Sequence, residues 1–238
     1  RVNDLLKNNT NVTYSDSLHL SVSMRSFRAE TLSNFVHSLL SFGSDTQRLY
    51  QDVSDKGYPV LLTRDIEKAR AWLRANARGS QQTGILVTKV AARFKPQAVN
   101  VLAQGDENAV HWFLEDKSDI RSSNYLEEAA TEIQVQGLEL DYACVLWDAD
   151  MRFYDNEWTF YKFNGKNKWN RENNPENKKY MLNAYRVLLT RARQGIVICV
   201  PHGNNRLKSE GFPEDPTRLP EFYDGTYAYF KSLGIKEL

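Results

Sequence analysis

Residues 131–147, TEIQVQGLELDYACVLW, decide the fold, because a polar segment with one glycine leads directly into a dense apolar run. The run YACVLW, residues 142–147, does not alternate between apolar and polar side chains, as expected for a strand that is covered on both faces of a parallel sheet. Gly137 permits a tight turn before this strand, and Glu139 places a carboxylate at the edge of the predicted sheet. By residue types alone, the turn either carries a solvated glutamate or forms the edge of a binding site.

Apolar runs of strand length alternate with helix-patterned stretches on either side of this segment. That alternation predicts an α/β fold with a mostly parallel sheet. Helices are predicted at residues 31–42, 64–78 and 178–194, from the helical spacing of apolar side chains or from capping residues and end charges. The other predicted strands are residues 18–22, 60–63, 84–87, 98–102 and 195–200.

The composition is that of a folded globular domain. The chain has 238 residues with 41% hydrophobic and 12% aromatic side chains, which is too rich in core-forming residues for a disordered segment. A formal net charge of +1 argues against a uniformly basic surface and against an acidic tail protein. No apolar run approaches the roughly 20 residues of a membrane-spanning helix. Residues 1–17 contain neither the apolar core of a secretory signal nor an initiator methionine, so we expect the chain to begin within a longer protein.

Cys144 and Cys199 lie within short apolar runs. We interpret them as buried free thiols in a reducing compartment, which predicts a cytoplasmic location, and a structural disulfide is the alternative. With two cysteines and four scattered histidines the sequence has no zinc-ligand spacing, and we predict no metal site.

Two short glycine motifs that bind nucleotide phosphates are missing from the sequence. Neither the P-loop G-x-x-x-x-G-K-[ST] nor the dinucleotide fingerprint G-x-G-x-x-G occurs. We therefore do not expect the chain to hydrolyse a nucleotide on its own.

Residues 151–179 interrupt the alternation with an aromatic, basic and asparagine-rich sequence. Asn164-Gly165 between two strand-like arms predicts a type I′ hairpin, which we expect to be followed by a disordered or mobile loop. Aromatic rings and cations together suit single-stranded nucleic acid, at about 1–3 kcal/mol per stacked base. The alternative is a hairpin that packs one aromatic face on its own domain. The candidate nucleic-acid contacts in this insertion are Trp158, Tyr161, Lys162, Lys166 and Trp169.

Arg191 has an unusual position in the predicted helix at residues 178–194. On a helical wheel it falls inside the apolar sector, whereas Arg186 and Arg193 lie on the polar side. Burying an unpaired charge costs several kcal/mol, so this guanidinium must be paired or must face a cleft. A buried ion pair and an anion-binding arginine both satisfy the pattern. The basic residues of the predicted helix at residues 64–78 are interpreted instead as a solvated face.

Several of these stretches resemble helicase motifs. QGLE at residues 136–139, preceded by Thr131, and YRVLLTRAR at residues 185–193 resemble motifs V and VI of superfamily 1 helicases, and LSVSMRS at residues 20–26 resembles motif IV. A closer resemblance, over nearly the whole chain, is to the Schlafen group-3-like DNA/RNA helicase domain family. It rests on five blocks in order: LSVSMRSFRAE, GILVTKVAARFKP, EIQVQGLELDYACVLWDADMRF, NAYRVLLTRARQGIVICVP and DPTRLPEFYDGT…LGI.

The resemblance implies a three-layer α/β/α RecA-like fold within an ATP-driven helicase or translocase that acts on DNA or RNA, expected to be single-stranded. In such helicases two RecA-like domains clamp ATP between them, and the first supplies the P-loop and the acidic motif that binds Mg²⁺. Residues 1–238 resemble the second domain, with residues 151–179 as an inserted hairpin and loop. ATP and Mg²⁺ would then be held mainly by an upstream RecA-like domain of the same polypeptide.

The resemblance also assigns roles to single residues. Arg191 corresponds to the arginine finger on the γ-phosphate, and Arg25 in motif IV corresponds to a second contact with that phosphate. Thr131 and Gln136 would lie between the nucleotide and the nucleic-acid backbone, and Glu139 would face the ribose. The positions assigned to nucleotide binding are Gln136, Gly137, Glu139 and Arg193.

Two positions depart from the motif pattern. Ile133 stands where many superfamily 1 motif V sequences carry a histidine beside the nucleic acid. Met24 stands where related motif IV sequences carry an aromatic residue that stacks on adenine, which leaves the nucleotide preference open.

Two other functions compete with the motor. Asp148 and Asp150 directly follow the predicted strand at residues 142–147, and carboxylates at the carboxyl end of a strand suit Mg²⁺, so a metal-dependent nuclease is one alternative. The other is a catalytically inert module that binds nucleic acid or protein. The presence of Arg25, Glu139 and Arg191 together favours the motor.

Overall fold

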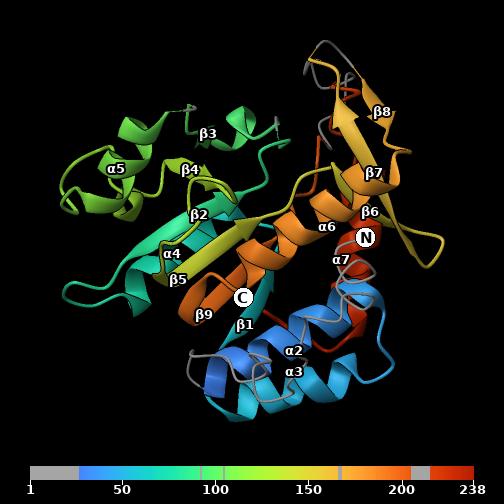
Figure 1. Cartoon of the computed structure of the whole chain (residues 1–238), viewed down its shortest axis with the longest axis horizontal. Coiled ribbons are helices and arrows are strands. Elements are labelled where there is room, and N and C mark those ends of the chain that lie inside the picture. The colour runs from blue at the N-terminus through green and yellow to red at the C-terminus, as the bar shows by residue number, and fades with distance from the viewer. Residues whose placement is uncertain (1–26, 92, 104, 166–167, 205–214) are drawn as a thin grey trace, which may run out of the picture.

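The computed structural model describes residues 27–91, 93–103, 105–165, 168–204 and 215–238. The predicted strand at residues 18–22, Arg25 and Lys166 lie outside these ranges. Across the described ranges, seven strands form one sheet in the order β10-β1-β9-β5-β2-β4-β3, and every neighbouring pair is parallel (Figure 1). The strands are β1 (Val60–Thr63), β2 (Thr83–Val87), β3 (Asn100–Val101), β4 (Glu128–Thr131), β5 (Leu140–Leu146), β9 (Ala192–Cys199) and β10 (Lys236–Glu237).

The predicted strands of the parallel sheet are confirmed wherever the structure describes them. β1 coincides with the prediction, and β2, β5 and β9 each overlap their predicted ranges with shifted ends. β3 retains only two residues of the predicted strand at 98–102. β4 and β10 were not predicted, because β4 is a four-residue Glu-Ala-Ala-Thr stretch without a distinctive apolar pattern and β10 has only two residues. Pairing with neighbouring strands, not local composition, makes both of them part of the sheet.

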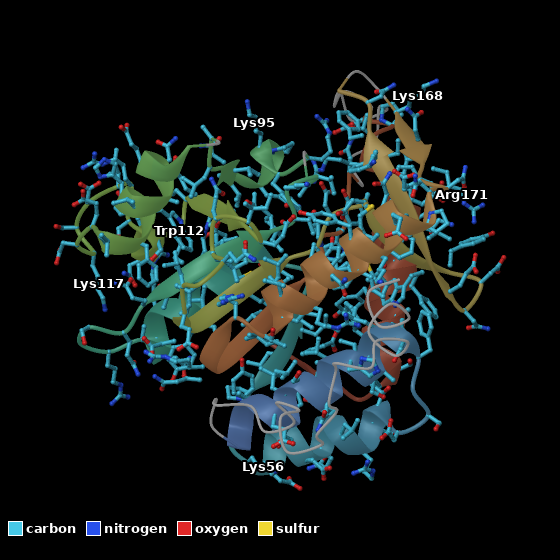
Figure 2. The ribbon with its side chains drawn as sticks, viewed as in Figure 1. Lys56, Lys95, Trp112, Lys117, Lys168 and Arg171 are labelled. Atoms are coloured by element: carbon cyan, nitrogen blue, oxygen red, sulfur yellow. The ribbon has the colours of Figure 1, made fainter. Side chains whose placement is uncertain are left out.

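Helices cover both faces of this sheet, which gives the three-layer α/β/α arrangement of a RecA-like fold. One apolar core lies between the sheet and the helices α2, α3, α6 and α7, and Trp112 of α5 belongs to it (Figure 2). The second core lies between the opposite face and α4. The helices are α2 (Phe27–Ser41), α3 (Thr46–Asp55), α4 (Ile66–Asn76), α5 (Asp106–Leu114), α6 (Pro175–Leu189) and α7 (Glu221–Ser232), with 3₁₀ turns η2 (Lys95–Gln97) and η3 (Ser123–Tyr125).

The central strands supply both cores with alternate residues. On β5, Val145 faces the first core while Cys144 and Leu146 face the second. On β9, Ile196 and Val197 divide in the same way. Because the side chains of a strand point alternately to opposite faces, burial on both faces requires a continuous apolar run. This is why the segment at residues 142–147 could be recognised as a central strand.

Helix α6 is shorter than predicted, and this changes the position of Arg191. The Asn174 side chain accepts hydrogen bonds from the first backbone N–H groups, and α6 ends at Leu189, so the predicted helix end at residue 194 is wrong. The Thr190 hydroxyl donates to backbone carbonyls of the last turn, and the chain then enters β9 at Ala192. Arg191 therefore lies in the link between helix and strand, and the helical-wheel argument does not apply to it.

Residues 151–171 form a separate three-stranded antiparallel sheet, made of β6 (Met151–Tyr154), β7 (Glu157–Phe163) and β8 (Trp169–Arg171). The predicted pairing of the arms around Asn164-Gly165 is confirmed, but Phe163 pairs with Trp169, so the connection is longer than a two-residue type I′ turn. The two-residue turn lies instead between β6 and β7, where Asp155 and Asn156 both have positive φ, at 49° and 60°. The predicted mobile loop is wrong, because β8 and the start of α6 occupy residues 169–179.

The structure confirms one of two smaller predictions and corrects the other. Cys144 and Cys199 are buried free thiols, as predicted. The solvated basic face is wrong for Arg70 on α4, which is buried and donates to the carbonyl oxygens of Leu126 (2.9 Å) and Ala98 (2.7 Å). Among the described helices, none is long and apolar enough to cross a membrane.

Candidate functional site

The segment that resembles motif V (residues 131–139, the motif V segment below) crosses one face of the sheet from edge to edge. It begins where β4 ends and finishes where β5 begins, and β4 and β5 are both parallel to β2 between them. Its backbone is wound into turns, in which the Val135 N–H donates to the Thr131 carbonyl (3.1 Å), and Val135 is buried in the core. The segment thus connects the carboxyl edge of the sheet to its amino edge.

The residues predicted for the nucleotide lie at the amino-edge end of this segment. Gln136, Gly137 and Glu139 are all exposed. Gly137 has a φ of +85°, a left-handed conformation that side chains other than glycine rarely adopt. The tight turn expected from the sequence is therefore present, and it exposes an amide, a stretch of backbone and a carboxylate next to one another.

Arg191 meets the motif V segment directly. It precedes β9 at the same amino edge and is only 9% exposed. Its Nη1 donates to the carbonyl oxygen of Leu138 (2.9 Å), and its own carbonyl accepts from the N–H of Leu140 (3.4 Å). The structure therefore brings the predicted arginine finger together with the segment Gln136–Glu139. Because Arg191 lies outside α6, its low exposure does not come from an apolar helix face.

Arg193 is the second arginine predicted for the nucleotide, and it lies on β9. Its guanidinium is more than half exposed and forms an ion pair with Asp141 (2.9 Å). The buried carboxylate of Asp141 also accepts from the Gln194 side chain (2.7 Å) and from the backbone N–H of Gln82 (2.9 Å). Arg193 thus has a structural partner on β5, and its open face remains at the amino edge.

Thr131 and Gln136 share a groove beside the motif V segment. Thr131 ends β4 and its N–H and hydroxyl both donate to Oε1 of Gln134 (3.0 Å each). The groove has a volume of about 690 Å³ and separates this segment from the apolar side of α5. Ile133 and Val110 stand exposed at its rim, and Lys89 contributes a cation. Its motif V wall continues to Leu138, the residue that Arg191 contacts.

Trp158 was predicted to contact nucleic acid, but the structure places it in the core. It is 8% exposed, and its indole N–H donates to the carbonyl of Leu40 (3.0 Å). Its ring packs against Trp147, Phe42 and Tyr229, at centroid distances of 5.6, 5.5 and 5.5 Å. No ring face is left for a base, so Trp158 is a structural residue of the hairpin.

The other described aromatic candidates of the hairpin also pack partly on their own domain. The Arg152 guanidinium covers the ring of Tyr161 at 3.9 Å, and the Trp169 indole N–H donates to the carbonyl of Thr217 (2.8 Å). Lys162 is exposed and forms an ion pair with Glu172 (2.6 Å). Figure 2 shows two further cations, Lys168 and Arg171, on the outer side of the hairpin. The candidate aromatic rings of the hairpin thus pack partly on their own domain, whereas Lys162, Lys168 and Arg171 are exposed.

Asp148 and Asp150 form the centre of a buried polar network. Both are fully buried. Asp150 accepts hydrogen bonds from the hydroxyls of Tyr185 (2.6 Å) and Thr88 (2.7 Å), and Asp148 accepts one from Tyr223 (3.1 Å). These bonds tie β5 to β2, α6 and α7, which is the arrangement of a structural network and not of an open Mg²⁺ site. Among the described residues, no group of three or more metal-ligand side chains is placed to hold a metal ion.

The network predicts a pH-dependent stability. Burial, together with the neighbouring Asp148, raises the pKa of Asp150 to about 7. Because this pKa is higher in the folded than in the unfolded chain, the folded state holds the proton more tightly. The resulting stabilisation is complete below the ordinary pKa of an aspartate and is lost as the pH rises to about 7. The free energy of unfolding should therefore be lower at pH 8 than at pH 5 through this group.

Asp150→Asn should reduce that pH dependence by about 1–3 kcal/mol between pH 5 and pH 8, measured by urea unfolding of the chain. Asp155→Asn is the matched control, because Asp155 is exposed in a turn. Equal pH dependence in wild type and Asp150→Asn would contradict the raised pKa.

The Lys89, Glu132 and Tyr180 side chains form a cluster that the sequence patterns did not single out. Glu132 is 6% exposed, and its carboxylate accepts from the backbone N–H of Lys89 (2.8 Å) and from the hydroxyl of Tyr180 (2.7 Å). The Lys89 ammonium lies 4.2 Å from the centroid of the Tyr180 ring. The one sequence feature that could have indicated this cluster is the glutamate directly after Thr131. Its two partners are 43 and 48 residues away in the chain, so no local pattern links them to it.

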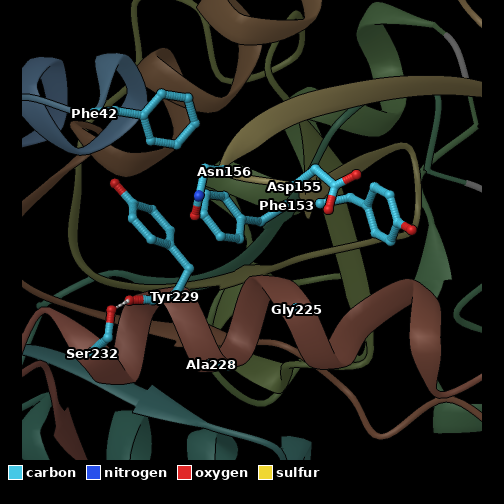
Figure 3. Close-up of a pocket in the computed structure, with 9 residues that line it drawn as sticks. Phe42, Phe153, Asp155, Asn156, Gly225, Ala228, Tyr229 and Ser232 are labelled. Atoms are coloured by element: carbon cyan, nitrogen blue, oxygen red, sulfur yellow. Dashed lines mark hydrogen bonds between the residues drawn. The ribbon is translucent and has the colours of Figure 1, made fainter.

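A second hollow, of about 750 Å³, lies between the β6–β7 turn and α7 (Figure 3). Phe42, Phe153 and Tyr229 line it, and Asp155 and Asn156 stand beside them in the turn. As far as the chain is described, no residue predicted for nucleotide or nucleic-acid binding lines it.

Comparison with known proteins gives one result. A family model described as Schlafen group 3, DNA/RNA helicase domain, matches residues 3–202. That range contains the motif V segment, α6, Arg191 and β9, and it ends before α7. Neither a curated protein nor a solved structure matches the chain.

Proposed function

Because the chain belongs to the Schlafen group 3 DNA/RNA helicase domain family, we propose that it is the second RecA-like motor domain of an ATP-dependent helicase or translocase. In this role it supplies the arginine finger and part of the nucleic-acid track. An upstream RecA-like domain of the same polypeptide supplies the P-loop and holds most of the ATP and Mg²⁺. The observation that carries the proposal is the contact of Arg191 with Leu138, which joins two segments that resemble helicase motifs at one edge of the sheet.

The polar groups at this edge of the sheet suit a nucleoside triphosphate. A guanidinium binds phosphate oxygens through several N–H groups, and a carboxylate accepts hydrogen bonds from sugar hydroxyls. ATP supplies the γ-phosphoryl group that is transferred to water. Arg191 neutralises the charge that develops on this group, an effect of about 10³–10⁵ in rate where arginine fingers have been measured. Gln136, Gly137 and Glu139 hold the sugar side, and Arg193 borders the same edge.

Nucleic acid is proposed to run along the opposite end of the motif V segment. Thr131 lies at the carboxyl edge, and the groove beside it also contains Gln136. The exposed cations of the hairpin, Lys162 and Lys168, could pair with phosphates, and Lys162 would do so from its ion pair with Glu172. Trp158 takes no part in this track because it belongs to the core.

This assignment predicts that residues 1–238 alone do not hydrolyse ATP, whereas the full-length protein hydrolyses ATP and is stimulated by single-stranded DNA or RNA. The measurement is phosphate release with and without each nucleic acid. ATP hydrolysis by the isolated chain would contradict the division of labour between two domains. A full-length protein that hydrolyses no ATP with any nucleic acid would overturn the motor assignment.

A further inference from the structure

We propose that the hydrogen bond between Tyr180 and Glu132 positions Arg191 in response to nucleic acid. Tyr180 and Glu132 act as positioning residues, because they couple the nucleic-acid end of the motif V segment to the arginine at its other end. This inference rests on the proposed function and adds a specific route by which that motor is regulated.

The first observation is a contact at the carboxyl edge of the sheet. Glu132 follows Thr131 directly, so its position is fixed by the same turn that presents Thr131 to the groove. The buried carboxylate receives the Tyr180 hydroxyl at 2.7 Å. A hydrogen bond to a charged group is worth about 1.5–3 kcal/mol, more than a bond between neutral groups. The hydrogen bond therefore ties this turn to the first half of α6, so that a movement of the turn would also move the helix.

The second observation is a contact at the amino edge, between the same two pieces of chain. Arg191 follows α6 and donates to the carbonyl of Leu138, near the end of the motif V segment. The segment and the helix are thus joined at both ends, by Glu132 with Tyr180 and by Leu138 with Arg191. Each of them runs from the carboxyl edge to the amino edge on the first-core side of the sheet, where Val135 and α6 are both buried.

The helix between the two contacts can carry a displacement because it is stiff. Tyr180 and Leu189, the last residue of α6, are separated by 9 positions, which corresponds to roughly 13 Å along the helix axis, and Arg191 follows two residues later. Met181, Tyr185 and Leu188 are buried along this stretch, so α6 moves as one packed element. Coupling between distant sites travels through such contiguous packed elements. A shift of Thr131 on binding nucleic acid would therefore change the position of the Arg191 guanidinium.

Tyr180 makes two contacts within this cluster although it is 40% exposed. The Lys89 ammonium lies over its ring, and the backbone of Lys89 is itself bound to Glu132. The end of β2, the motif V segment and α6 therefore meet at a single carboxylate. Burial and the bond to Glu132 raise the pKa of the Tyr180 hydroxyl well above its ordinary value, so this hydroxyl remains a donor at physiological pH.

The test compares Tyr180→Phe with wild type in the full-length protein. The measured quantity is the ratio of ATP turnover at saturating single-stranded nucleic acid to turnover without it. Tyr180→Phe should lower this ratio about fivefold or more, the range of typical coupling free energies. The nucleic-acid concentration for half-maximal stimulation should change little, because Tyr180 is not assigned a contact with nucleic acid. Glu132→Gln should have a similar effect, and the double variant should be no worse than the stronger single variant.

Tyr229→Phe is the matched control, because it also removes one tyrosine hydroxyl bond of 2.8 Å, to the carbonyl of Leu39, without touching α6 or the motif V segment. It should leave the stimulation ratio as in wild type. A normal ratio in Tyr180→Phe, or additive effects in the double variant, would overturn the coupling while leaving the motor assignment intact. Absence of ATP hydrolysis in the wild-type protein would instead refute the proposed function itself.

Discussion

Replacing Arg191 with alanine should lower nucleic-acid-stimulated ATP hydrolysis by the full-length protein at least tenfold, toward the range of about 10³–10⁵ measured for arginine fingers. In the proposed role the guanidinium stabilises the charge that develops on the γ-phosphoryl group in the transition state, so its loss would act on turnover. Arg191→Lys should recover little, because an ammonium cannot reproduce the forked contacts of a guanidinium. The measurement is kcat for ATP at saturating nucleic acid.

The control for this substitution has to show that the fold survives. Loss of the bond to Leu138 should cost about 1 kcal/mol in the free energy of unfolding, far less than the whole stability of a domain. Arg48→Ala is a suitable matched variant, because Arg48 is an exposed arginine on α3 that pairs with its neighbours Asp45 and Asp52. It should leave kcat unchanged. Wild-type turnover in a well-folded Arg191→Ala protein would remove the arginine finger from the mechanism.

Trp158→Ala should destabilise the chain by about 3–5 kcal/mol, the usual cost of truncating a buried tryptophan to alanine. The side chain fills the space between Trp147, Phe42 and Tyr229. Removing it also deprives the carbonyl oxygen of Leu40 of the indole N–H that donates to it. The change is measured as the free energy of unfolding in urea. In conditions where the variant is still folded, we expect its affinity for single-stranded nucleic acid to be close to that of wild type.

Tyr154→Ala is the control that shows whether the loss of any aromatic side chain from this three-stranded sheet destabilises the chain. Tyr154 is an aromatic residue of the same three-stranded sheet, but it is 67% exposed. Its replacement should cost no more than about 0.5 kcal/mol. If Trp158→Ala were as stable as Tyr154→Ala and bound nucleic acid less tightly, then the side chain would be a binding residue after all.

Some strands of the sheet could be predicted from local composition, and others could not. The continuous apolar run at residues 142–147 identified a central parallel strand, because burial on both faces leaves no other composition possible. β4 could not be found in this way, since its four residues become a strand only through pairing with β2 and β3. The same holds for Trp158, because alternation within a strand indicates two faces but does not say which of them meets the core.

Arg191 shows the same limit at the site. A helical wheel assumes one continuous helix, and nothing local in LLTRAR marks the exit of the chain from α6 after Leu189. The exit coincides with the start of β9, whose first residue, Ala192, pairs with Leu140 of β5. The helical wheel predicted a guanidinium with little exposure, but in the structure Arg191 lies outside the helix and donates to the carbonyl of Leu138, 53 residues earlier in the chain.

By itself, the sequence determined the class of fold, the place of the motif V turn at Gly137 and the family to which the chain belongs, because these depend on local composition and on the order of short motifs. Tertiary structure alone decided which side chains meet. It brought Arg191 to Leu138, Tyr180 to Glu132 and Trp158 into the core, because each of these contacts joins segments that are distant in the chain. Such contacts arise from the packing of helices on a sheet whose strand order is not written in any single stretch of residues.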